Sequence, residues 1–270
     1  MFKQGPIIRD AAPGTADERF ITTCSHVDES EEIDRCAERR RVLFDRLRAE
    51  GARFKVAVFD DALAGFIHGV PIRHASWGAV GENLMMIPCL FVRERFSGRG
   101  VGRALVEAVE AAARRTGTNG VAVVAYRDLA EAAWFMPAPF FDELGFEEIE
   151  RRGHEALLWR PFLPNLAAPR LLRPDWSFQP VSGKVVVDLF WNEFCPTSSI
   201  EARRVREVAR EFGDNVIIRE YQAEDRSILL CHQTPRAVYI NGREIGWGYE
   251  APREGIRNAI RDAFRAIEPC

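Results

Sequence analysis

Several features that define large classes of protein are missing from this chain of 270 residues. Lysine occurs only at Lys3, Lys55 and Lys184, so nearly all positive charge is arginine, and the formal net charge is −3. Such a balance gives no general attraction to nucleic acid or to anionic membranes, and we expect neither as a partner. The N-terminus has no apolar signal segment, and no apolar run approaches the length of a membrane span. The sequence therefore predicts a soluble, cytoplasmic protein.

Cysteine is present but in no pattern that indicates a disulfide framework or a metal site. The six cysteines are Cys24, Cys36, Cys89, Cys195, Cys231 and Cys270. No pair has C-x-x-C spacing, and the five histidines do not combine with them at zinc spacing. We expect no bound metal, and we expect most of these cysteines to be buried free thiols.

A glycine-rich stretch at residues 96–105, Phe-Ser-Gly-Arg-Gly-Val-Gly-Arg-Ala-Leu, is the most informative part of the chain. The apolar run before it, residues 84–92, is short enough for a buried strand. The residues after it repeat with helical periodicity, and Val101, Leu105, Val109 and Ala112 share one face. A strand, a glycine loop and a helix are therefore expected in that order.

Such a loop is suited to bind an anion. Gly98, Gly100 and Gly102 leave backbone N–H groups uncovered at a helix N-terminus, where the helix dipole favours negative charge. Arg99 and Arg103 add positive charge. The pattern predicts a phosphate or pyrophosphate ligand, and a glycine turn that only redirects the chain is the alternative.

Two other phosphate-binding motifs do not fit. A dinucleotide fingerprint needs an acidic residue at the end of the next strand. The strand expected at residues 121–125 ends in Tyr126-Arg127, so that the nearest acid, Asp128, comes too late. A P-loop needs Gly-Lys-Ser/Thr, which is absent.

The stretch resembles motif A of the GNAT acetyltransferases, whose Gln/Arg-x-x-Gly-x-Gly/Ala loop holds the pyrophosphate of acetyl-CoA. Gly100-Val101-Gly102 matches the core of that motif, and Ser97 stands at its first position. Residues 140–146, Phe-Phe-Asp-Glu-Leu-Gly-Phe, resemble the closing Gly-Phe signature of the family. A Tyr that protonates the leaving thiolate often precedes that Gly by four residues, and Phe141 occupies its place. The resemblance covers residues 5–162.

The resemblance implies an α/β fold with a mixed sheet, the acyl-CoA N-acyltransferase fold, and acetyl-CoA as co-substrate. The backbone of Leu90, Phe91 and Val92 would pair with the pantetheine arm. The pyrophosphate would be held by Ser97, Gly98, Arg99, Gly100, Val101, Gly102 and Arg103. The thioester would lie where two strands splay apart, and an amine would attack it directly, helped by backbone N–H groups at the tetrahedral oxygen.

The residues offer several candidates for the catalytic acid and base. Met86 stands where some relatives of this family carry a Glu. Glu82, His68, His74 and Tyr126 remain as alternatives for the base. Cys89 is a further candidate near the thioester, with a buried core thiol as its alternative role.

The rest of the first part predicts alternating helices and strands. We expect strands at 6–9, 54–59, 63–70, 147–151 and 156–159, and helices at 17–24, 31–50, 128–135 and 140–144. Ser30 is the expected cap of the helix at 31–50. The run Arg39-Arg40-Arg41 is expected on its solvated face.

We expect a first domain at residues 1–162, a proline-rich linker at residues 163–182 and a second domain at residues 183–270. The second part reads as a strand at 185–191, a helix at 199–212, a strand at 216–219, a strand at 237–240 with an Asn241-Gly242 turn, and a helix at 252–267. This order resembles the thioredoxin fold, which would make the Thr234–Pro235 bond cis.

The redox pair of that family is represented here by Cys195-Pro196-Thr197-Ser198, which keeps one thiol. A thiol at a helix N-terminus is often reactive, because the helix dipole stabilises the thiolate. Cys231 is a candidate resolving thiol. The alternative is a domain that keeps the fold and serves as a substrate clamp or dimer surface. An acetyltransferase followed by such a degenerate thioredoxin-like unit resembles the YoaP-like group of GNAT proteins.

The sequence predicts an acetyl-CoA-dependent N-acetyltransferase that acts on a primary amine of a small molecule. The candidate catalytic residues are Glu82, Cys89, Tyr126 and Cys195. A homodimer is an expectation from the pairing of sheets in this family. Two alternatives remain, a non-catalytic acyl-CoA-binding sensor and a thiol-dependent redox protein that uses Cys195.

Overall fold

The computed structural model describes residues 5–128, 135–246 and 251–267. The chain divides into two compact units. Unit 1 consists of Met1–Glu29 and Arg41–Leu172, and unit 2 consists of Ser30–Arg40 and Arg173–Cys270. Each unit is therefore built from two separate stretches of sequence.

Unit 1 is organised around a seven-stranded sheet with the order β1-β2-β3-β5-β6-β8-β7. The strands of unit 1 are β1 (Ile7–Asp10), β2 (Arg53–Phe59), β3 (Ala62–Pro71), β4 (Ala79–Val80), β5 (Met85–Val92), β6 (Gly120–Tyr126), β7 (Glu147–Arg152), β8 (Glu155–Pro161) and β9 (Arg170–Leu171). Its helices are α1 (Ala16–Thr22), the second part of α2 (Glu31–Ala49), α3 (Val101–Arg115) and α4 (Ala138–Asp142), with short 3₁₀ turns η1 (Ile72–His74) and η2 (Glu94–Phe96). Within the described residues β5 and β6 form the one parallel pair of this sheet.

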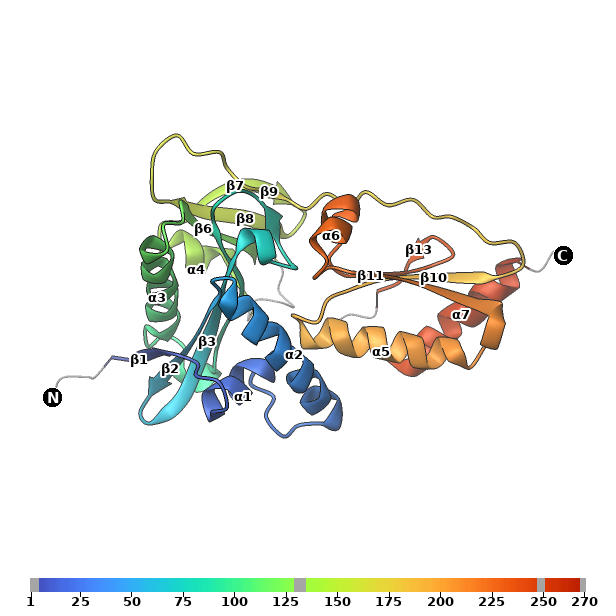
Figure 1. The fold of residues 1–270 in the computed structure, drawn as a ribbon, viewed down its shortest axis with the longest axis horizontal. Helices are drawn as coiled ribbons and strands as arrows, with labels where there is room; N and C mark the ends of the chain where they lie inside the picture. Colours follow the sequence, from blue (N-terminus) through green and yellow to red (C-terminus); the bar gives the residue numbers. More distant parts are fainter. Residues whose placement is uncertain (1–4, 129–134, 247–250, 268–270) are drawn as a thin grey trace. The chain divides into compact units, whose positions relative to one another are not determined.

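Helices cover both faces of this sheet. Helices α3 and α4 pack on one face, where Leu105 and Val109 of α3 and Phe141 of α4 are fully buried. On the other face Phe44 of α2 stacks on Phe54 of β2, with ring centroids 4.2 Å apart. Figure 1 shows α3 and α4 on one side of β2 and β3, and α1 on the other. The predicted helical face of residues 101–112 is confirmed.

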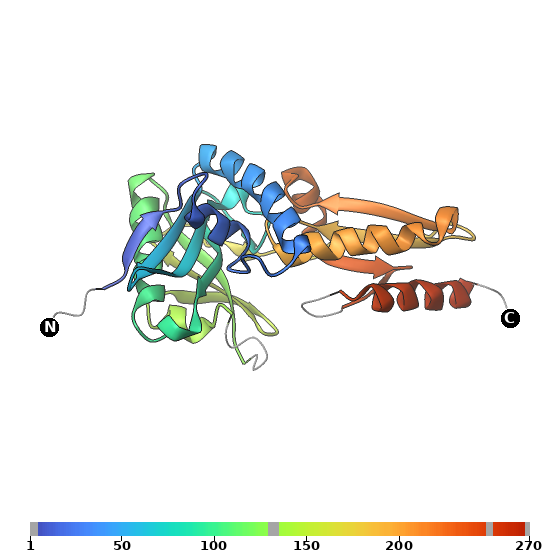
Figure 2. The same ribbon diagram turned by 90° about the horizontal axis from the view of Figure 1, so that it is seen from below.

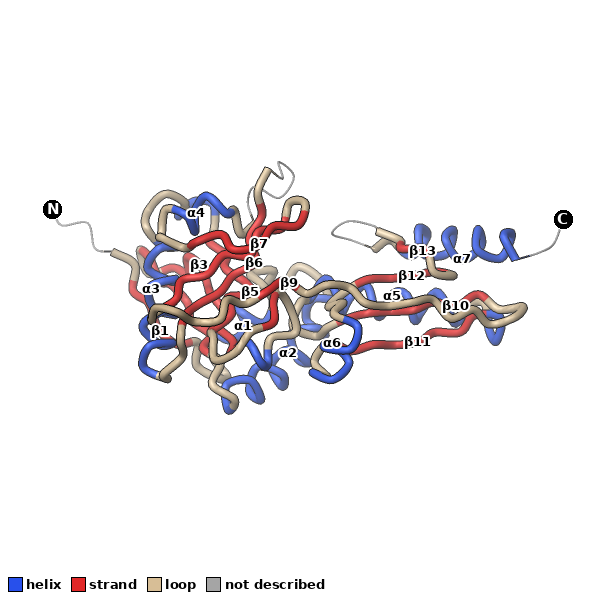
Figure 3. The backbone as a smooth tube through the Cα atoms, turned by 90° about the horizontal axis from the view of Figure 1, so that it is seen from above, coloured by secondary structure: helices blue, strands red, loops and turns tan. Residues whose placement is uncertain are grey.

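Unit 2 contains a four-stranded sheet with the order β11-β10-β12-β13. Its strands are β10 (Val185–Trp191), β11 (Val216–Gln222), β12 (Ala237–Ile240) and β13 (Arg243–Glu244), and its helices are α5 (Pro196–Arg210), α6 (Arg226–His232), α7 (Arg253–Ile267) and the first part of α2, with the 3₁₀ turn η4 (Gly213–Asn215). The central strand β10 is parallel to β11 and antiparallel to β12. Figure 3 shows these three strands side by side, and Figure 2 shows α5 and α7 running along the sheet.

Most expected elements are present, with differences of a few residues at their ends. The backbone N–H of Ile33 donates to Ser30 Oγ at 3.2 Å, so the predicted cap of α2 is confirmed. The short helix α6 was not expected from the sequence. The helix expected at residues 128–135 lies mostly outside the described residues.

Two further expectations were wrong. Arg40 is buried, with 1% of its surface exposed, although its neighbours Arg39 and Arg41 are exposed as predicted. No peptide bond among the described residues is cis, so Thr234–Pro235 is trans.

Candidate functional site

Strands β5 and β6 separate partway along their length. Their parallel register ends where Ile87 lies opposite Val123, and no later pair follows among the described residues. On its other edge β5 stays paired with β3 as far as Val92, which lies opposite Gly65. The backbone of residues 88–92 therefore has no ladder partner on the β6 side. Unpaired backbone groups of this kind can pair with an extended ligand.

A register shift accompanies this separation. The pairing of β3 with β5 is irregular between His68 and Val70, which indicates a bulge next to the point where β5 leaves β6. A bulge bends its strand and ends regular pairing. Pro88, which has no N–H to give to a ladder, lies at the same point of β5.

The glycine loop follows directly after β5. Gly98 and Gly100 have φ angles of +71° and +79°, a conformation that other residues adopt only with strain. A Cβ at either position would meet no described atom within 4 Å, so open space lies beside the loop. Gly100 is the N-cap of α3, and no described side chain caps the helix. The first N–H groups of α3 are thus available to an anion.

The third glycine has a different role. A Cβ at Gly102 would lie 3.0 Å from Cζ of Phe140, so this glycine allows α4 to pack closely against α3. Of the two arginines, Arg99 approaches Asp60, with 3.4 Å between Nη1 and Oδ2. Arg103 is exposed on the first turn of α3. Positive charge therefore accompanies the backbone donors, as the sequence predicts.

One row of side chains crosses the sheet beside the separation of β5 and β6. Phe54 of β2 lies opposite His68 of β3, and His68 lies opposite Cys89 of β5. Residues directly opposite each other in antiparallel strands point to the same face. His68 is fully buried between the rings of Phe44, Phe54 and Phe66. Cys89 is half-buried.

Tyr126 occupies the other side of the gap. It is the last residue of β6, and its backbone N–H donates to the carbonyl oxygen of Met136 at 2.9 Å. Its half-buried ring lies 5.9 Å from that of Phe135. Since β5 and β6 are parallel, Tyr126 and Val92 end the two diverging strands. The structure thus places Cys89 opposite His68 in neighbouring strands, and it places Tyr126 at the end of β6, beyond the point where β6 separates from β5.

Other candidates lie elsewhere. Glu82 is exposed in the loop before β5, at the opposite end of this strand from the glycine loop, so the structure does not bring it to the gap. His74 lies in η1 and contacts Glu50, with 3.2 Å between Nε2 and Oε2. Met86 and Phe141 are fully buried apolar side chains. The positions where an acid and a base were sought therefore carry neither.

Cys195 lies in unit 2 at the N-cap of α5. Its Sγ is 3.0 Å from Thr197 Oγ1, which also accepts a hydrogen bond from Nη1 of Arg236 at 2.9 Å. The backbone N–H of Cys195 donates to Oδ1 of Asn192 at 2.9 Å. Hydroxyl and guanidinium groups around this half-buried thiol could not be assigned from the sequence, since Arg236 is distant from it in the chain.

One family model matches the chain. Residues 20–146, just under half of the chain, match the acetyltransferase (GNAT) family. The match supports a GNAT acetyltransferase domain in this segment and an N-acetyltransferase activity. No curated protein matches the chain.

Several solved structures are similar to it. The PaiA N-acetyltransferase of Thermoplasma acidophilum, in complex with coenzyme A, is 16% identical over 59% of this chain and 100% of its own, with a TM-score of 0.43. YncA of Salmonella typhimurium, with its cofactor acetyl-CoA, is 18% identical over 61% of this chain and 98% of its own, with a TM-score of 0.45. An aminoglycoside 6'-acetyltransferase type Ii is 17% identical over 59% of this chain and 99% of its own, with a TM-score of 0.43.

Among the described residues no helix combines the length and apolar composition that crossing a membrane requires. Nor do the described ranges contain three or more His, Cys, Asp or Glu side chains grouped so that they could hold a metal ion.

Proposed function

We propose that unit 1 is the catalytic part of an acetyl-CoA-dependent N-acetyltransferase whose acceptor is a primary amine of a small molecule. The observation that carries the proposal is the separation of β5 from β6 next to an uncapped helix N-terminus with a glycine loop. The first feature suits an extended amide-bearing arm, and the second suits a pyrophosphate.

The residues present fit the cofactor. The unpaired β5 edge at Leu90, Phe91 and Val92 would hold the pantetheine amides. The pyrophosphate would bind the loop at Ser97, Gly98, Arg99, Gly100, Val101, Gly102 and Arg103. Open space beside Gly98 and Gly100 supports this assignment, because a side chain there would occupy the place of a phosphate.

Acetyl-CoA supplies an acetyl group already activated as a thioester. The protein then has to hold the amine beside it and to exchange protons, and positioning of two reactants accounts for much of the acceleration in such reactions. Because Phe141 cannot donate a proton, Tyr126 and Cys89 are the side chains of the two diverging strands that can exchange one. Backbone N–H groups of β5 beyond Pro88 can stabilise the tetrahedral oxygen.

The first test is calorimetric titration of the full chain with acetyl-CoA. Gly100→Glu should abolish binding, since the new carboxylate would occupy the anion site. Gly117→Glu is the matched control, because Gly117 also has a positive φ, +72°, and open space around it, but follows the C-terminus of α3. The proposal is supported if the wild type and Gly117→Glu bind acetyl-CoA and Gly100→Glu does not.

Two results would contradict it. Absence of acetyl-CoA binding by the wild type would remove the cofactor from the proposal. Binding without transfer to any member of a panel of primary amines would favour a non-catalytic acyl-CoA sensor, the function suggested by the apolar residues Met86 and Phe141.

For the second part of the chain we propose a thioredoxin-like domain of the YoaP-like group at residues 183–270. The order β10, α5, β11, α6, β12, β13 and α7, with Cys195 at the start of α5, supports it. The contact of Cys195 with Thr197 and the approach of Arg236 favour a second function, thiol–disulfide exchange. The Cys195 thiolate would attack a disulfide sulfur, form a mixed disulfide and release the other thiolate.

This second function has a separate test. Cys195→Ser should abolish the mixed disulfide that the wild type forms with an aromatic disulfide reagent, detected by mass spectrometry. Cys231→Ser is the control, since Cys231 is an exposed thiol on α6. Equal labelling at Cys195 and Cys231 would show simple exposure and would remove the special role of Cys195.

A further inference from the structure

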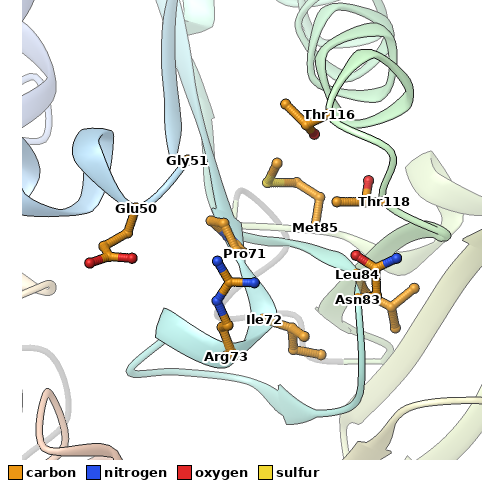
Figure 4. A pocket seen from close by; sticks show the side chains of 10 residues that line it. All are labelled: Glu50, Gly51, Pro71, Ile72, Arg73, Asn83, Leu84, Met85, Thr116 and Thr118. Carbon is orange, nitrogen blue, oxygen red and sulfur yellow. The ribbon is translucent and has the colours of Figure 1, made fainter.

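Unit 1 contains a cavity of about 200 Å³ at the end of the sheet opposite the glycine loop. Its lining residues are Glu50, Gly51, Pro71, Ile72, Arg73, Asn83, Leu84, Met85, Thr116 and Thr118. Strand β5 begins at this cavity and α3 ends at it, whereas the glycine loop follows the end of β5 and precedes α3. The cavity is therefore separate from the acetyl-CoA site proposed above. Figure 4 shows its lining side chains.

The floor of the cavity is apolar. Ile72, Leu84 and Met85 are each only 1% exposed and line the cavity together with Pro71. An apolar protein cavity of about 150 Å³ holds a molecule as large as benzene. A cavity of this size therefore suits a metabolite of roughly eight to ten non-hydrogen atoms with an apolar portion.

One wall carries a guanidinium. Nε of Arg73 donates to Nε2 of His74 at 2.9 Å, and the same His74 atom lies 3.2 Å from Oε2 of Glu50. The hydrogen bond to His74 orients Arg73 through Nε and leaves both of its Nη groups without a hydrogen bond to any described residue. A guanidinium held in this way presents parallel N–H donors, which match a carboxylate.

The other wall offers acceptors. The hydroxyls of Thr116 and Thr118 donate to the carbonyl oxygen of Ala113 at 3.0 and 2.9 Å, so their lone pairs remain available. Asn83 donates through Nδ2 to the carbonyl oxygen of Gly117 at 3.1 Å, and its Oδ1 is an acceptor. The C-terminal end of α3, which has negative dipole character, lies here too. An ammonium group is the ligand that this wall fits.

In Figure 4 Glu50, Pro71 and Arg73 lie to one side, and Thr116, Thr118 and Asn83 lie across from them, with Met85 between. We propose that this cavity binds a small α-amino acid with an apolar side chain. Arg73 binds the carboxylate of this amino acid. The ammonium is bound by Thr116, Thr118 and Asn83. The apolar side chain lies on Ile72, Leu84 and Met85. The proposal does not depend on the acetyltransferase function.

The test is calorimetry of the full chain with L-leucine, compared with two analogues that each lack one charged group. Isocaproate lacks the ammonium and isoamylamine lacks the carboxylate. We expect each analogue to bind at least about tenfold more weakly than leucine, because each lacks the charged group that one of the two polar walls would bind. Arg73→Ala should weaken leucine binding by about tenfold or more as well.

Arg46→Ala is the matched control, since Arg46 is exposed on α2 and does not line the cavity, and the leucine affinity of this variant should equal that of the wild type. Arg73 is itself exposed, so its substitution should leave the fold intact, which circular dichroism checks. Absence of leucine binding up to about 10 mM would overturn the proposal. So would unchanged affinity in Arg73→Ala, equal binding of isoamylamine, or competition between leucine and acetyl-CoA.

Discussion

At the scale of single residues, Asp188 is the most unusual group in unit 2. It lies in the central strand β10 and is fully buried. Oδ1 accepts a hydrogen bond from the hydroxyl of Tyr221 at 3.2 Å and lies 3.9 Å from Nη1 of Arg219, while Oδ2 has no hydrogen-bond partner among the described residues. Burial raises the pKa of Asp188 above its ordinary value, and Tyr221 and Arg219 oppose this only in part. A buried carboxylate with an oxygen that has no hydrogen-bond partner destabilises the folded state when it is charged.

This raised pKa predicts a pH-dependent stability. The pKa of Asp188 is higher in the folded state than in the unfolded state. Its contribution to the unfolding free energy is therefore fully present below the ordinary aspartate pKa and is lost as pH rises through the folded-state pKa. Asp188→Asn cannot ionise, so near pH 7 it should exceed the wild type by about 1–2 kcal/mol in unfolding free energy, with a smaller difference near pH 4. Denaturant unfolding across this range measures it. Parallel pH curves of the unfolding free energy for Asp188→Asn and for the wild type would contradict the argument.

At the scale of elements, the approach of β3 to β5 depends on a glycine. A Cβ at Gly65 would lie 2.4 Å from the carbonyl oxygen of Phe91, which is backbone and cannot move aside alone. Phe91 belongs to the β5 segment assigned to the pantetheine arm. The spacing of the two strands therefore determines both packing and the proposed cofactor site.

Gly65→Ala should force β5 away from β3. We expect a loss of about 3 kcal/mol in unfolding free energy, the upper end of what overpacking usually costs. Weaker binding of acetyl-CoA should accompany it, because Phe91 and Val92 must shift. Thermal unfolding and calorimetry measure the two effects. Gly246→Ala, where a Cβ meets no described atom within 4 Å, is the control and should be nearly neutral. Full stability in Gly65→Ala would mean that the strands can part without cost.

Elements with strong local patterns could be predicted from the sequence. The apolar run at 84–92 and the glycines after it suffice to predict β5, the loop and α3, since each pattern is contained within a few residues. The separation of β5 from β6 depends on which strands lie side by side, and a local pattern does not show this. Helix α6 was missed because seven residues hold less than two full helical periods. The cavity near Arg73 was not foreseen either, because its walls come from four separate stretches of sequence.

At the scale of the whole molecule, unit 2 includes residues far from it in sequence. Residues Ser30–Arg40 belong to it, and they are held by charged contacts. Glu32 pairs with Arg203, Arg204 and Arg253, and the hydrogen bond that Arg204 donates to the carboxylate lowers the pKa of Glu32. A boundary drawn only from the linker composition leaves these contacts out, because local sequence gives no sign of them.

Arg40 gives the sharpest test of this composite unit. Its Nε donates to the carbonyl oxygen of Phe194 at 2.9 Å, next to Cys195, and the side chain is buried. Arg40→Met keeps much of the apolar stem but leaves that buried oxygen without this donor, which should cost about 1–3 kcal/mol. Arg41→Met, whose exposed side chain is 3.5 Å from Asp45, should stay within about 0.5 kcal/mol of the wild type.

Hydrogen exchange can locate the effect of Arg40→Met, because amide protection reports local opening free energy. We expect faster exchange in β10 and β11, the strands that lead to and flank Phe194, and unchanged protection in β6 and α3 of unit 1. Protection lost equally in β6 would mean that the two units unfold together. Unchanged exchange in β10 would mean that the hydrogen bond from Arg40 to Phe194 does not stabilise unit 2.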